Sequence, residues 1–520
     1  MANKTLFKSL IGKLLPKADA VNEAGGSAYK LSPKAALAQY AATGCLNATY
    51  YASAEDQLQN ILNLCSHPEV EPEFIARVAL YARSRGQMKD LPALLCAALS
   101  VFGPGLLAEI FDRVIDDGKM LRNFVQIMRS GVVGRKSLGT LPKRLVHGWF
   151  DARSDEQIFR ASVGNDPSLA DVIRMVHPKP KSASRAALYG YLVGQPHQSA
   201  DLPELVKQFE AFKAGESKNL PDVPFQMLTS LELSKDDWKA IARTAPWQMT
   251  RMNLNTFARH GVFEDAEMIG LIAARLRDEQ SIQRARVFPY QLMVAFTQVN
   301  SDVPAEVREA LQDAMEIATR NVPSINGQIF ICPDVSGSMH SPITGVRKGA
   351  TSVVRCVDVA ALVAGCFLRT NRSAEAIPFK EAVVTDLMLN PRDSVMTNAA
   401  KMTKIPPGGT NCSAPLAWLN ARKAIGQLVV FVSDNQSWVD VARGRGTATM
   451  EQWNIFKASN PSAKMVCIDL QPYGTVQAAE REDVLNIGGF SDHVFDLIAE
   501  FANGTLNTQH WVGVIEAMSL

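Results

Sequence analysis

The fold of the second half of the chain is decided by residues 328–338, which read QIFICPDVSGS. The run begins with apolar and β-branched residues and stops at a proline, a pattern that predicts a short buried β-strand. The strand leads directly into Asp334, Ser336 and Ser338, so one tight turn presents oxygen-bearing side chains at alternate positions. Gly337 allows the backbone of that turn to fold closely around a centre.

Further apolar runs alternate with a helical pattern on the C-terminal side of this segment. We expect a helix over residues 356–370 and strands over 376–379, 382–387, 428–432 and 464–470. Short runs rich in Val and Ile that alternate with helices predict a mostly parallel α/β sheet covered on both faces. Ligands of such sheets bind beyond the carboxyl ends of the strands, where Thr410 and Asp434 are expected to lie.

The oxygen side chains at these strand ends predict a cation site. Hard oxygen donors suit Mg²⁺, which prefers a small octahedral shell and keeps some of its waters. Asp434 would bind the ion directly, or hold a bound water or a Ser hydroxyl. The alternative is an Asp-capped strand exit that binds no metal. The predicted ligands are Asp334, Ser336, Ser338, Thr410 and Asp434.

The sequence does not favour catalysis. Cys412 and Ser336 are conceivable nucleophiles. However, Ser336 does not stand in a GxSxG element, and the nearby His340 has no evident orienting acid. The chain contains no Walker A, GxGxxG or HExxH element. We therefore expect a binding protein and not an enzyme.

Composition and charge set wider limits. The 520 residues are 47% hydrophobic and 20% charged, which is enough apolar material to fill sizeable cores. A formal net charge of +2 means that any nucleic-acid site must be a local patch. None of the eight Cys forms a CxxC pair, and no apolar run reaches the ~20 residues of a membrane span. We expect reduced thiols in a cytoplasmic protein.

The first half of the chain predicts helix after helix from about residue 32 to 318. Apolar faces recur at helical spacing near 74–81, 91–99, 106–115 and 121–128, separated by turns with Gly and Pro. Short helices joined by short turns predict stacked pairs of the HEAT or armadillo kind. Residues 1–24 are a separate amphipathic segment, which docks on the protein's own body or contacts a membrane surface.

Basic residues are concentrated in parts of this helical half. Residues 119–150 hold seven Lys and Arg with no Asp or Glu, and residues 241–263 also lack acids. A solenoid would merge these segments into a stripe suited to phosphate contacts, whereas separate helices would leave them as solvated faces. Trp149, Phe150 and Trp247 fit core positions or base-stacking platforms. The candidate RNA-binding residues are Lys119, Arg122, Arg135, Lys136, Lys143, Arg144, His177, Lys179, Lys181, Arg185 and Arg251.

Several segments together resemble the Ro autoantigen family, whose helical RNA-binding module is called TROVE. They are GQMKDLPALL (86–95), GRKSL (134–138), WF (149–150), HPKP (177–180) and RMNL (251–254), followed by the cation-site segment. That last segment resembles von Willebrand factor A-like domains with a metal-ion-dependent adhesion site, where the metal typically leaves one position for a partner's anion. The resemblance implies a mainly α plus α/β fold, a ring of HEAT-like repeats closed by the A-like domain. The implied domains are 1–24, 25–324 and 325–520.

The resemblance also implies a function. In this family the outer basic surface binds a small noncoding stem-loop RNA, the Y RNA, and single-stranded 3′ ends of misfolded or decaying RNAs enter a central hole. Lys143, Arg144, His177, Lys179 and Arg185 fall in the matching outer segments. A cytoplasmic RNA quality-control protein is implied, with Mg²⁺ at the adhesion-type site and an exoribonuclease as a further partner. The alternative is a metal-dependent protein-interaction or adhesion-type module with a helical adaptor, which would need apolar hot spots.

Overall fold

A computed structural model of the chain describes residues 16–22, 25–43, 53–86, 88–165, 167–285, 287, 289–343, 354–437, 446–471, 474–490, 494–504 and 510–520. The chain divides into two compact units. The sheet unit comprises residues 1–64 and 270–517, and the helical unit comprises residues 65–269 and 518–520. Most of the amphipathic segment predicted over residues 1–24 lies outside the described residues.

The helical unit consists of short α-helices joined by short turns. The helices are α4 (Pro72–Ser84), α5 (Asp90–Phe102), α6 (Pro104–Val114), α7 (Gly118–Ser130), α8 (Thr140–Asp151), α9 (Asp155–Ala161), α10 (Leu169–Val176), α11 (Ala183–Val193), α12 (Glu204–Lys213), α13 (Phe225–Leu228), α14 (Lys235–Thr244), α15 (Trp247–Met252), α16 (Leu254–Arg259) and, crossing into the other unit, α17 (Ala266–Leu276). Single 3₁₀ turns, η1 (Ser199–Asp201) and η2 (Val262–Glu264), interrupt this series.

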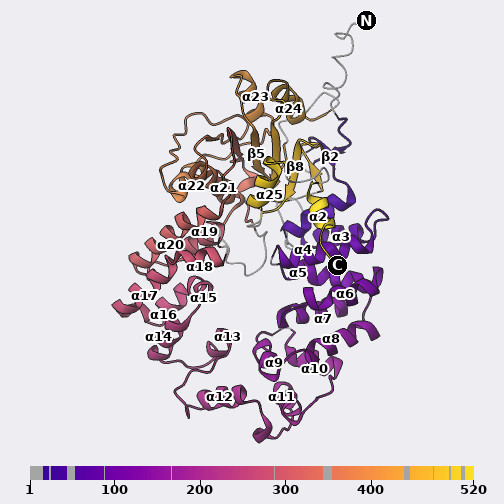
Figure 1. Cartoon of the computed structure of the whole chain (residues 1–520), viewed down its shortest axis with the longest axis vertical. Coiled ribbons are helices and arrows are strands. Elements are labelled where there is room, and N and C mark those ends of the chain that lie inside the picture. Colours follow the sequence, from indigo (N-terminus) through magenta and orange to yellow (C-terminus); the bar gives the residue numbers. More distant parts are fainter. Residues whose placement is uncertain are drawn as a thin grey trace. The chain divides into compact units, whose positions relative to one another are not determined.

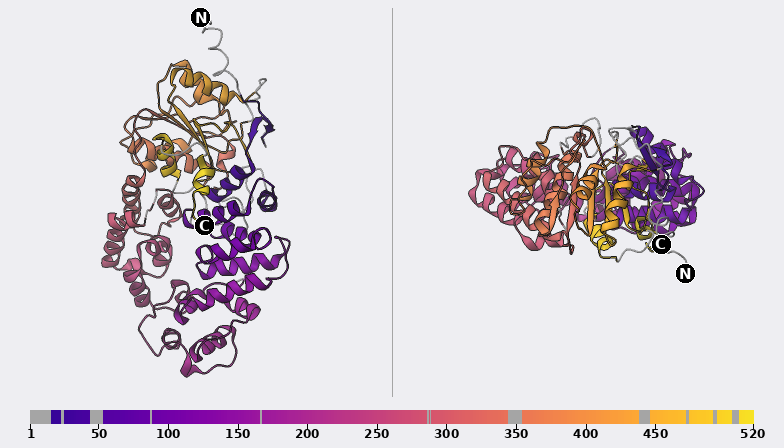
Figure 2. Two further views of the ribbon diagram at one scale, coloured as in Figure 1. Left: turned by 45° about the vertical axis from the view of Figure 1, so that its right-hand side comes forward. Right: turned by 90° about the horizontal axis from the view of Figure 1, so that it is seen from above.

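Helices close in sequence pack together in this unit. Helix α5 lies on α4 and α7, and α6 lies on α4 and α8, as stacked helical pairs require. The purple helices α4 to α8 lie side by side in Figure 1 and in the left view of Figure 2. The helices predicted near 74–81, 91–99, 106–115 and 121–128 are confirmed as α4 to α7.

Polar caps carried by the sequence fix where several of these helices begin. The Ser154 and Ser168 side chains each accept a hydrogen bond from the backbone N–H of the residue three positions on, and the side chain of that residue accepts one from the backbone N–H of the serine. Asp117 Oδ1 accepts a bond from Met120 N (2.7 Å) at the start of α7. The same helix ends at Gly131, whose φ of 87° suits glycine.

The sheet unit contains a five-stranded parallel sheet in the order β4-β3-β5-β6-β8. Its strands are β3 (Ile329–Pro333), β4 (Ala374–Ala376), β5 (Leu428–Ser433), β6 (Lys464–Asp469) and β8 (Val484–Gly488). Strands β3 and β5 are buried along their whole length, as parallel strands covered on both faces must be. The predicted parallel α/β sheet is confirmed.

Helices cover this sheet on both faces. The helices of the unit are α2 (Pro33–Thr43), α3 (Ala54–Cys65), α18 (Glu279–Arg284), α19 (Pro289–Gln298), α20 (Ala305–Ala318), α21 (Cys356–Thr370), α22 (Val395–Thr403), α23 (Ala414–Ala421), α24 (Ala448–Ser459), α25 (Val494–Ala502) and α26 (His510–Glu516), with 3₁₀ turns η3 (Thr319–Asn321) and η4 (Ser338–His340). Helix α21 packs on β3, β4 and β5, and its Phe367 meets Phe495 of α25. On the opposite face Phe330 of β3 meets Phe456 of α24.

Of the predicted strands, the one over 376–379 is misplaced and the one over 382–387 is wrong. Strand β4 covers 374–376, Phe379 forms only isolated bridges, and no strand covers 382–387. The reason is a reversal of the chain after β4, in which Val384 N donates to Pro378 O (2.8 Å), so the backbone groups are used within the turn. The sequence also missed β8 and a small antiparallel sheet of β1 (Ala20–Val21), β2 (Ser27–Lys30) and β7 (Thr475–Val476).

The compact units do not divide at residue 324. Helices α19 and α20 pack on α21 and α22, so residues from 270 onward belong to the sheet unit. Within the described ranges, no helix is both long enough and apolar enough to cross a bilayer.

Candidate functional site

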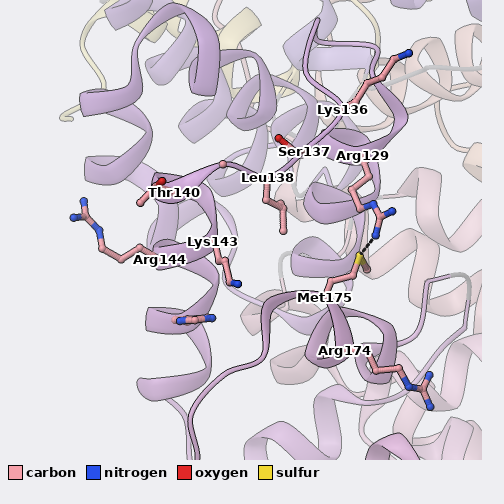
Figure 3. Close-up of a pocket in the computed structure, with 11 residues that line it drawn as sticks. Arg129, Lys136, Ser137, Leu138, Thr140, Lys143, Arg144, Arg174 and Met175 are labelled. Carbon is pink, nitrogen blue, oxygen red and sulfur yellow. Dashed lines mark hydrogen bonds between the residues drawn. The ribbon is translucent and has the colours of Figure 1, made fainter.

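A basic pocket lies between the end of α7, the start of α8 and the end of α10. Its volume is about 860 Å³, and Figure 3 shows it at close range. Neither Asp nor Glu occurs in its lining. The lining residues are Arg129, Lys136, Ser137, Leu138, Gly139, Thr140, Lys143, Arg144, His147, Arg174 and Met175.

The loop between α7 and α8 shapes this pocket. Gly131, Gly134 and Gly139 all have positive φ, which lets the chain turn sharply twice within nine residues. At Gly139 a Cβ would lie 2.3 Å from Arg135 Nη2, so a side chain there would displace Arg135. Arg135 Nη1 donates to Ser100 O (2.9 Å), which ties the loop to α5. The half-buried Arg135 therefore fastens the loop that carries the lining residues Lys136 to Gly139.

The cations of the pocket are largely uncompensated. Lys136, Lys143 and Arg144 are exposed and form no ion pair with any residue that the structure describes. Arg129 Nη1 approaches Met175 Sδ (2.7 Å) and has no carboxylate partner in the described part of the chain. Lys143 and Arg129 point into the same open space in Figure 3, whereas Arg144 extends from α8 in another direction. The pocket thus concentrates positive charge in a concave surface.

Three basic members of the pocket, Arg129, His147 and Arg174, are absent from the candidate residues predicted from the sequence. His147 stands one helical turn after Lys143 on α8, and its Nε2 donates to Val176 O (2.7 Å). The i, i+4 spacing of these residues was the signal available in the sequence. Arg174 pairs with Asp171 (3.2 Å) and donates to Val193 O (2.7 Å), so its charge is partly compensated.

Other predicted RNA-binding residues lie outside the pocket lining. Lys119, His177 and Lys179 are exposed, and His177 adopts φ 51° at the end of α10. Lys181 is exposed and pairs with Asp151 (3.3 Å). Arg251 is half-buried and donates to Gln248 Oε1 (3.2 Å from Nε), so it is held along its own helix.

Two predicted contact residues are corrected by the structure. Arg122 and Arg185 are each only 8% exposed. Arg122 Nη1 donates to Ala161 O (3.1 Å), and burial lowers the pKa of its guanidinium. Arg185 pairs with Asp155 and donates to two backbone carbonyls. Both guanidinium groups join helices to each other and do not face solvent.

The three aromatic residues left open by the sequence belong to the core. Trp149 and Phe150 are fully buried, and Trp247 is 6% exposed. Arg153 covers the ring of Trp149, with its Cζ 3.8 Å from the ring centroid. The stacking-platform alternative is therefore wrong for these residues in this structure.

The predicted cation ligands meet at the carboxyl edge of the sheet. Asp334 Oδ1 accepts from Ser336 N (2.8 Å), and the Ser336 and Ser338 hydroxyl oxygens are 3.5 Å apart. Asp434 follows the adjacent strand β5. Ser433, the last residue of β5, donates from Oγ to Asp334 Oδ2 (2.6 Å). Asp334, Ser336, Thr410 and Asp434 are all at most 2% exposed.

The loop that carries Thr410 is fastened to this edge. Gly337 N donates to Gly408 O (2.9 Å), and Ser437 Oγ donates to Thr410 O (3.3 Å). A Cβ at Gly408 would lie 2.3 Å from Glu381 Oε1, so a side chain there would displace the Glu381 carboxylate, which accepts a bond from Gly409 N (2.7 Å). The predicted oxygen donors are thus brought together by two loops that contact each other.

The electrostatics of this edge fit a divalent cation. Burial, together with the neighbouring Asp434 carboxylate, raises the pKa of Asp334 to about 7. Burial also raises the pKa of Asp434. Asp434 Oδ2 is buried and forms no hydrogen bond of normal geometry with the described residues, although the Ser338 hydroxyl approaches this carboxylate. No group of three or more His, Cys, Asp or Glu side chains in the described ranges forms a ready metal cage. The predicted ligand set relies on hydroxyl oxygens as well, as Mg²⁺ sites with retained waters do.

One acidic residue at this edge was not singled out from the sequence. Asp469 ends β6 and pairs in register with Ser433. It is fully buried, and both burial and the Asp434 carboxylate raise its pKa well above the ordinary value. The available signal was an aspartate inside the otherwise apolar run 464–470.

Two domain models match the chain. The TROVE domain model matches residues 143–323, and the Ro60 vWA domain model matches residues 328–502. The domain limit predicted at 324 falls between these two matches.

The relatives and solved structures that are similar to the chain include the following. "RNA-binding protein RO60" of Deinococcus radiodurans is 24% identical, over 93% of this chain and 95% of the relative. The protein of the same name from Caenorhabditis elegans is 21% identical, over 46% of this chain and 38% of the relative. The crystal structure of the Deinococcus radiodurans RO (RSR) protein superposes with a TM-score of 0.64 at 21% identity, covering 91% of this chain and 100% of that one. This last likeness confirms the fold.

Proposed function

Because the chain pairs a TROVE domain with a Ro60 vWA domain and so belongs to the Ro family, we propose that it binds a small stem-loop RNA of the Y RNA type on its helical unit. The coarser role, RNA binding, follows from the family and from relatives that carry the name RNA-binding protein RO60. Both domains are binding modules, so the chain is not an enzyme.

The observation that carries this proposal is the basic pocket. Lys136, Lys143 and Arg144 are exposed and unpaired among the described residues, and no carboxylate lines the pocket beside them. Folded RNA is bound mainly through its phosphates and its shape, which such a concave cationic surface suits. The TROVE match begins at Lys143.

The same pocket argues against the rival function, a metal-dependent module whose helical part docks proteins. Protein hot spots are apolar and aromatic at their centre. Here the concave surface is lined mainly by cationic and hydroxyl side chains, with Leu138 and Met175 as its larger apolar members.

Finer parts of the function are proposals that rest on the family resemblance. They are the capture of single-stranded 3′ ends of defective RNAs, a cytoplasmic role in RNA quality control, and cooperation with an exoribonuclease. For the sheet unit we propose that Asp334, Ser336, Ser338, Thr410 and Asp434 hold Mg²⁺. The buried Asp434 Oδ2, which forms no hydrogen bond of normal geometry with the described residues, supports this cation site.

A salt titration of the full chain with a labelled stem-loop RNA tests the RNA proposal. Affinity should fall steeply between about 50 and 200 mM salt, with a log–log slope of roughly −0.9 for each phosphate contacted. A flat salt response would contradict the role of the basic pocket. An absorbance ratio at 260 and 280 nm before and after nuclease treatment shows whether RNA copurifies with the protein.

A further inference from the structure

Asp469 lies in a row of polar residues that crosses three neighbouring strands. Ser433 is its register partner on β5, and Ser433 Oγ donates to Asp334 Oδ2 (2.6 Å) at the end of β3. Asp434 follows Ser433 directly. Three carboxylates, two of them fully buried and Asp434 1% exposed, therefore stand at one edge of the sheet.

The hydrogen bonds of Asp469 are incomplete. Its Oδ1 accepts from Gln471 N (3.2 Å), while Oδ2 is buried and has no partner of normal hydrogen-bond geometry in the described residues. The Asn435 side chain approaches this carboxylate, yet Asn435 Nδ2 also lacks a properly formed bond. An acceptor oxygen without a donor in a dry site is costly, which indicates a missing donor at this position.

The charges of the three carboxylates are also uncompensated. None of the ion pairs between described residues includes Asp334, Asp434 or Asp469. Their hydrogen-bond partners are hydroxyl and backbone N–H groups, which carry no full positive charge. Buried acids in this arrangement need a cation or must take up protons.

We propose that Asp469 is a positioning residue of the cation site, where its Oδ2 accepts a hydrogen bond from a water carried by the bound divalent cation. This inference rests on the proposed cation site of Asp334 and Asp434. Asp469 acts through water because the described acidic side chains do not converge into a direct metal cage. The class of ligand is a hydrated, hard divalent cation of the Mg²⁺ type.

The third carboxylate, that of Asp469, changes the net charge of the filled cation site. With three acids around a divalent ion, the filled site keeps a net negative charge, so an approaching carboxylate from a partner is repelled. The cation then holds the ends of β3, β5 and β6 together and has little need of an external anion. An adhesion-type site with fewer buried acids would instead attract that anion.

Cation titration of the full chain, with Asp469→Asn against wild type, tests this role. Mn²⁺ affinity is read from the free-ion electron paramagnetic resonance signal, and thermal unfolding is recorded in EDTA and in Mg²⁺. We expect Asp469→Asn to weaken Mn²⁺ affinity about 10- to 100-fold. In EDTA the same variant should unfold at or above the wild-type temperature, since it lacks a buried acid that must otherwise stay unpaired or take up a proton. Asp386→Asn is the matched control, because Asp386 is an exposed acid of the same unit with no ion pair among described residues.

The outcomes separate the two proposals. If wild type binds Mn²⁺ and Asp469→Asn binds it equally well, the role of Asp469 is overturned and the cation site stands. If wild type binds neither Mn²⁺ nor Mg²⁺, both proposals fail. A lower unfolding temperature in EDTA with unchanged Mn²⁺ affinity would make Asp469 merely structural. Asp469→Ser provides the affinity measurement if the Asn variant does not fold.

Acetate should strengthen Mn²⁺ binding to the variant and leave wild type unchanged, and the opposite pattern would overturn the repulsion argument.

Discussion

Arg185, which is buried, and Asp155, which is half-buried, form an ion pair that joins α11 to α9. The same guanidinium group donates to Phe150 O (2.9 Å) and Arg153 O (2.6 Å), so it also holds the end of α8. Only 9% of the Arg185 side chain is exposed. A basic residue in a basic stretch of sequence is thus part of the scaffold, because its charge is used inside the protein.

Replacing Arg185 should therefore affect stability and leave RNA binding by the folded protein intact. We expect Arg185→Ala to lower the free energy of unfolding by about 3 kcal/mol, since Asp155 would be left as a poorly solvated, unpaired charge. Urea unfolding followed by tryptophan fluorescence measures this loss. RNA affinity, measured at a temperature where the variant is folded, should match wild type. Normal stability combined with weak RNA binding would contradict this scaffold role and indicate that Arg185 contacts RNA.

For the pocket residues we expect weaker RNA binding and unchanged stability. Lys143→Ala combined with Arg144→Ala should weaken stem-loop RNA binding roughly tenfold and reduce the salt slope by about 2, one for each lost phosphate contact. Both side chains are exposed and unpaired among the described residues, so the unfolding temperature should stay nearly unchanged.

A charge-matched control separates position from net charge. Arg372 and Lys404 are exposed residues of the sheet unit with no ion pair in the described part of the chain. Their double Ala variant removes the same charge and should bind RNA as wild type does. Equal losses in both double variants would mean that binding follows net charge and not the pocket.

The sequence located the pocket region but not the direction of each side chain. Lys136, Lys143 and Arg144 were singled out correctly as exposed cations, together with Arg122 and Arg185, which are buried. The sequence shows where basic residues occur, but it does not show which of them will face a carboxylate that lies far along the chain. The partner of Arg185, Asp155, lies 30 positions away, and packing of α9 on α11 brings them together.

The parallel sheet was predictable because its strands are continuous apolar runs. Strands β3, β5 and β6 match the expected segments closely. The prediction over 382–387 was wrong because the backbone after β4 bonds within a turn. Strands β1 and β7 have two residues each, too few to show any periodicity. Asp469 was overlooked because sequence alone does not reveal that the ends of β5 and β6 share a register.

The cysteines provide a test of burial in both units. All seven described Cys are free thiols and buried, and burial raises the pKa of Cys65 and of Cys467 to about 12. Alkylation requires the thiolate, so at pH 8 these thiols should react very slowly in the native protein. Iodoacetamide labelling with peptide mass mapping, in buffer and in concentrated urea, measures the difference. Fast native labelling of Cys412, which is 2% exposed, would contradict its burial and support a role as a reactive group.

Removing Asp334 should abolish the response of the sheet unit to Mg²⁺. Asp334 receives hydrogen bonds from Ser336 N and Ser433 Oγ, which hold its carboxylate between β3 and β5. For wild type, Mg²⁺ at about 100 times its dissociation constant should add about 2.7 kcal/mol of stability, and EDTA should remove it. Asp334→Ala should unfold at the same temperature with and without Mg²⁺. The unfolding temperatures with and without Mg²⁺ are compared within the same variant, because losing one of several buried, mutually repelling acids can itself stabilise the metal-free form. If the unfolding temperature of wild type does not change with Mg²⁺, the other interpretation of this turn is favoured, a capped strand end that binds no metal.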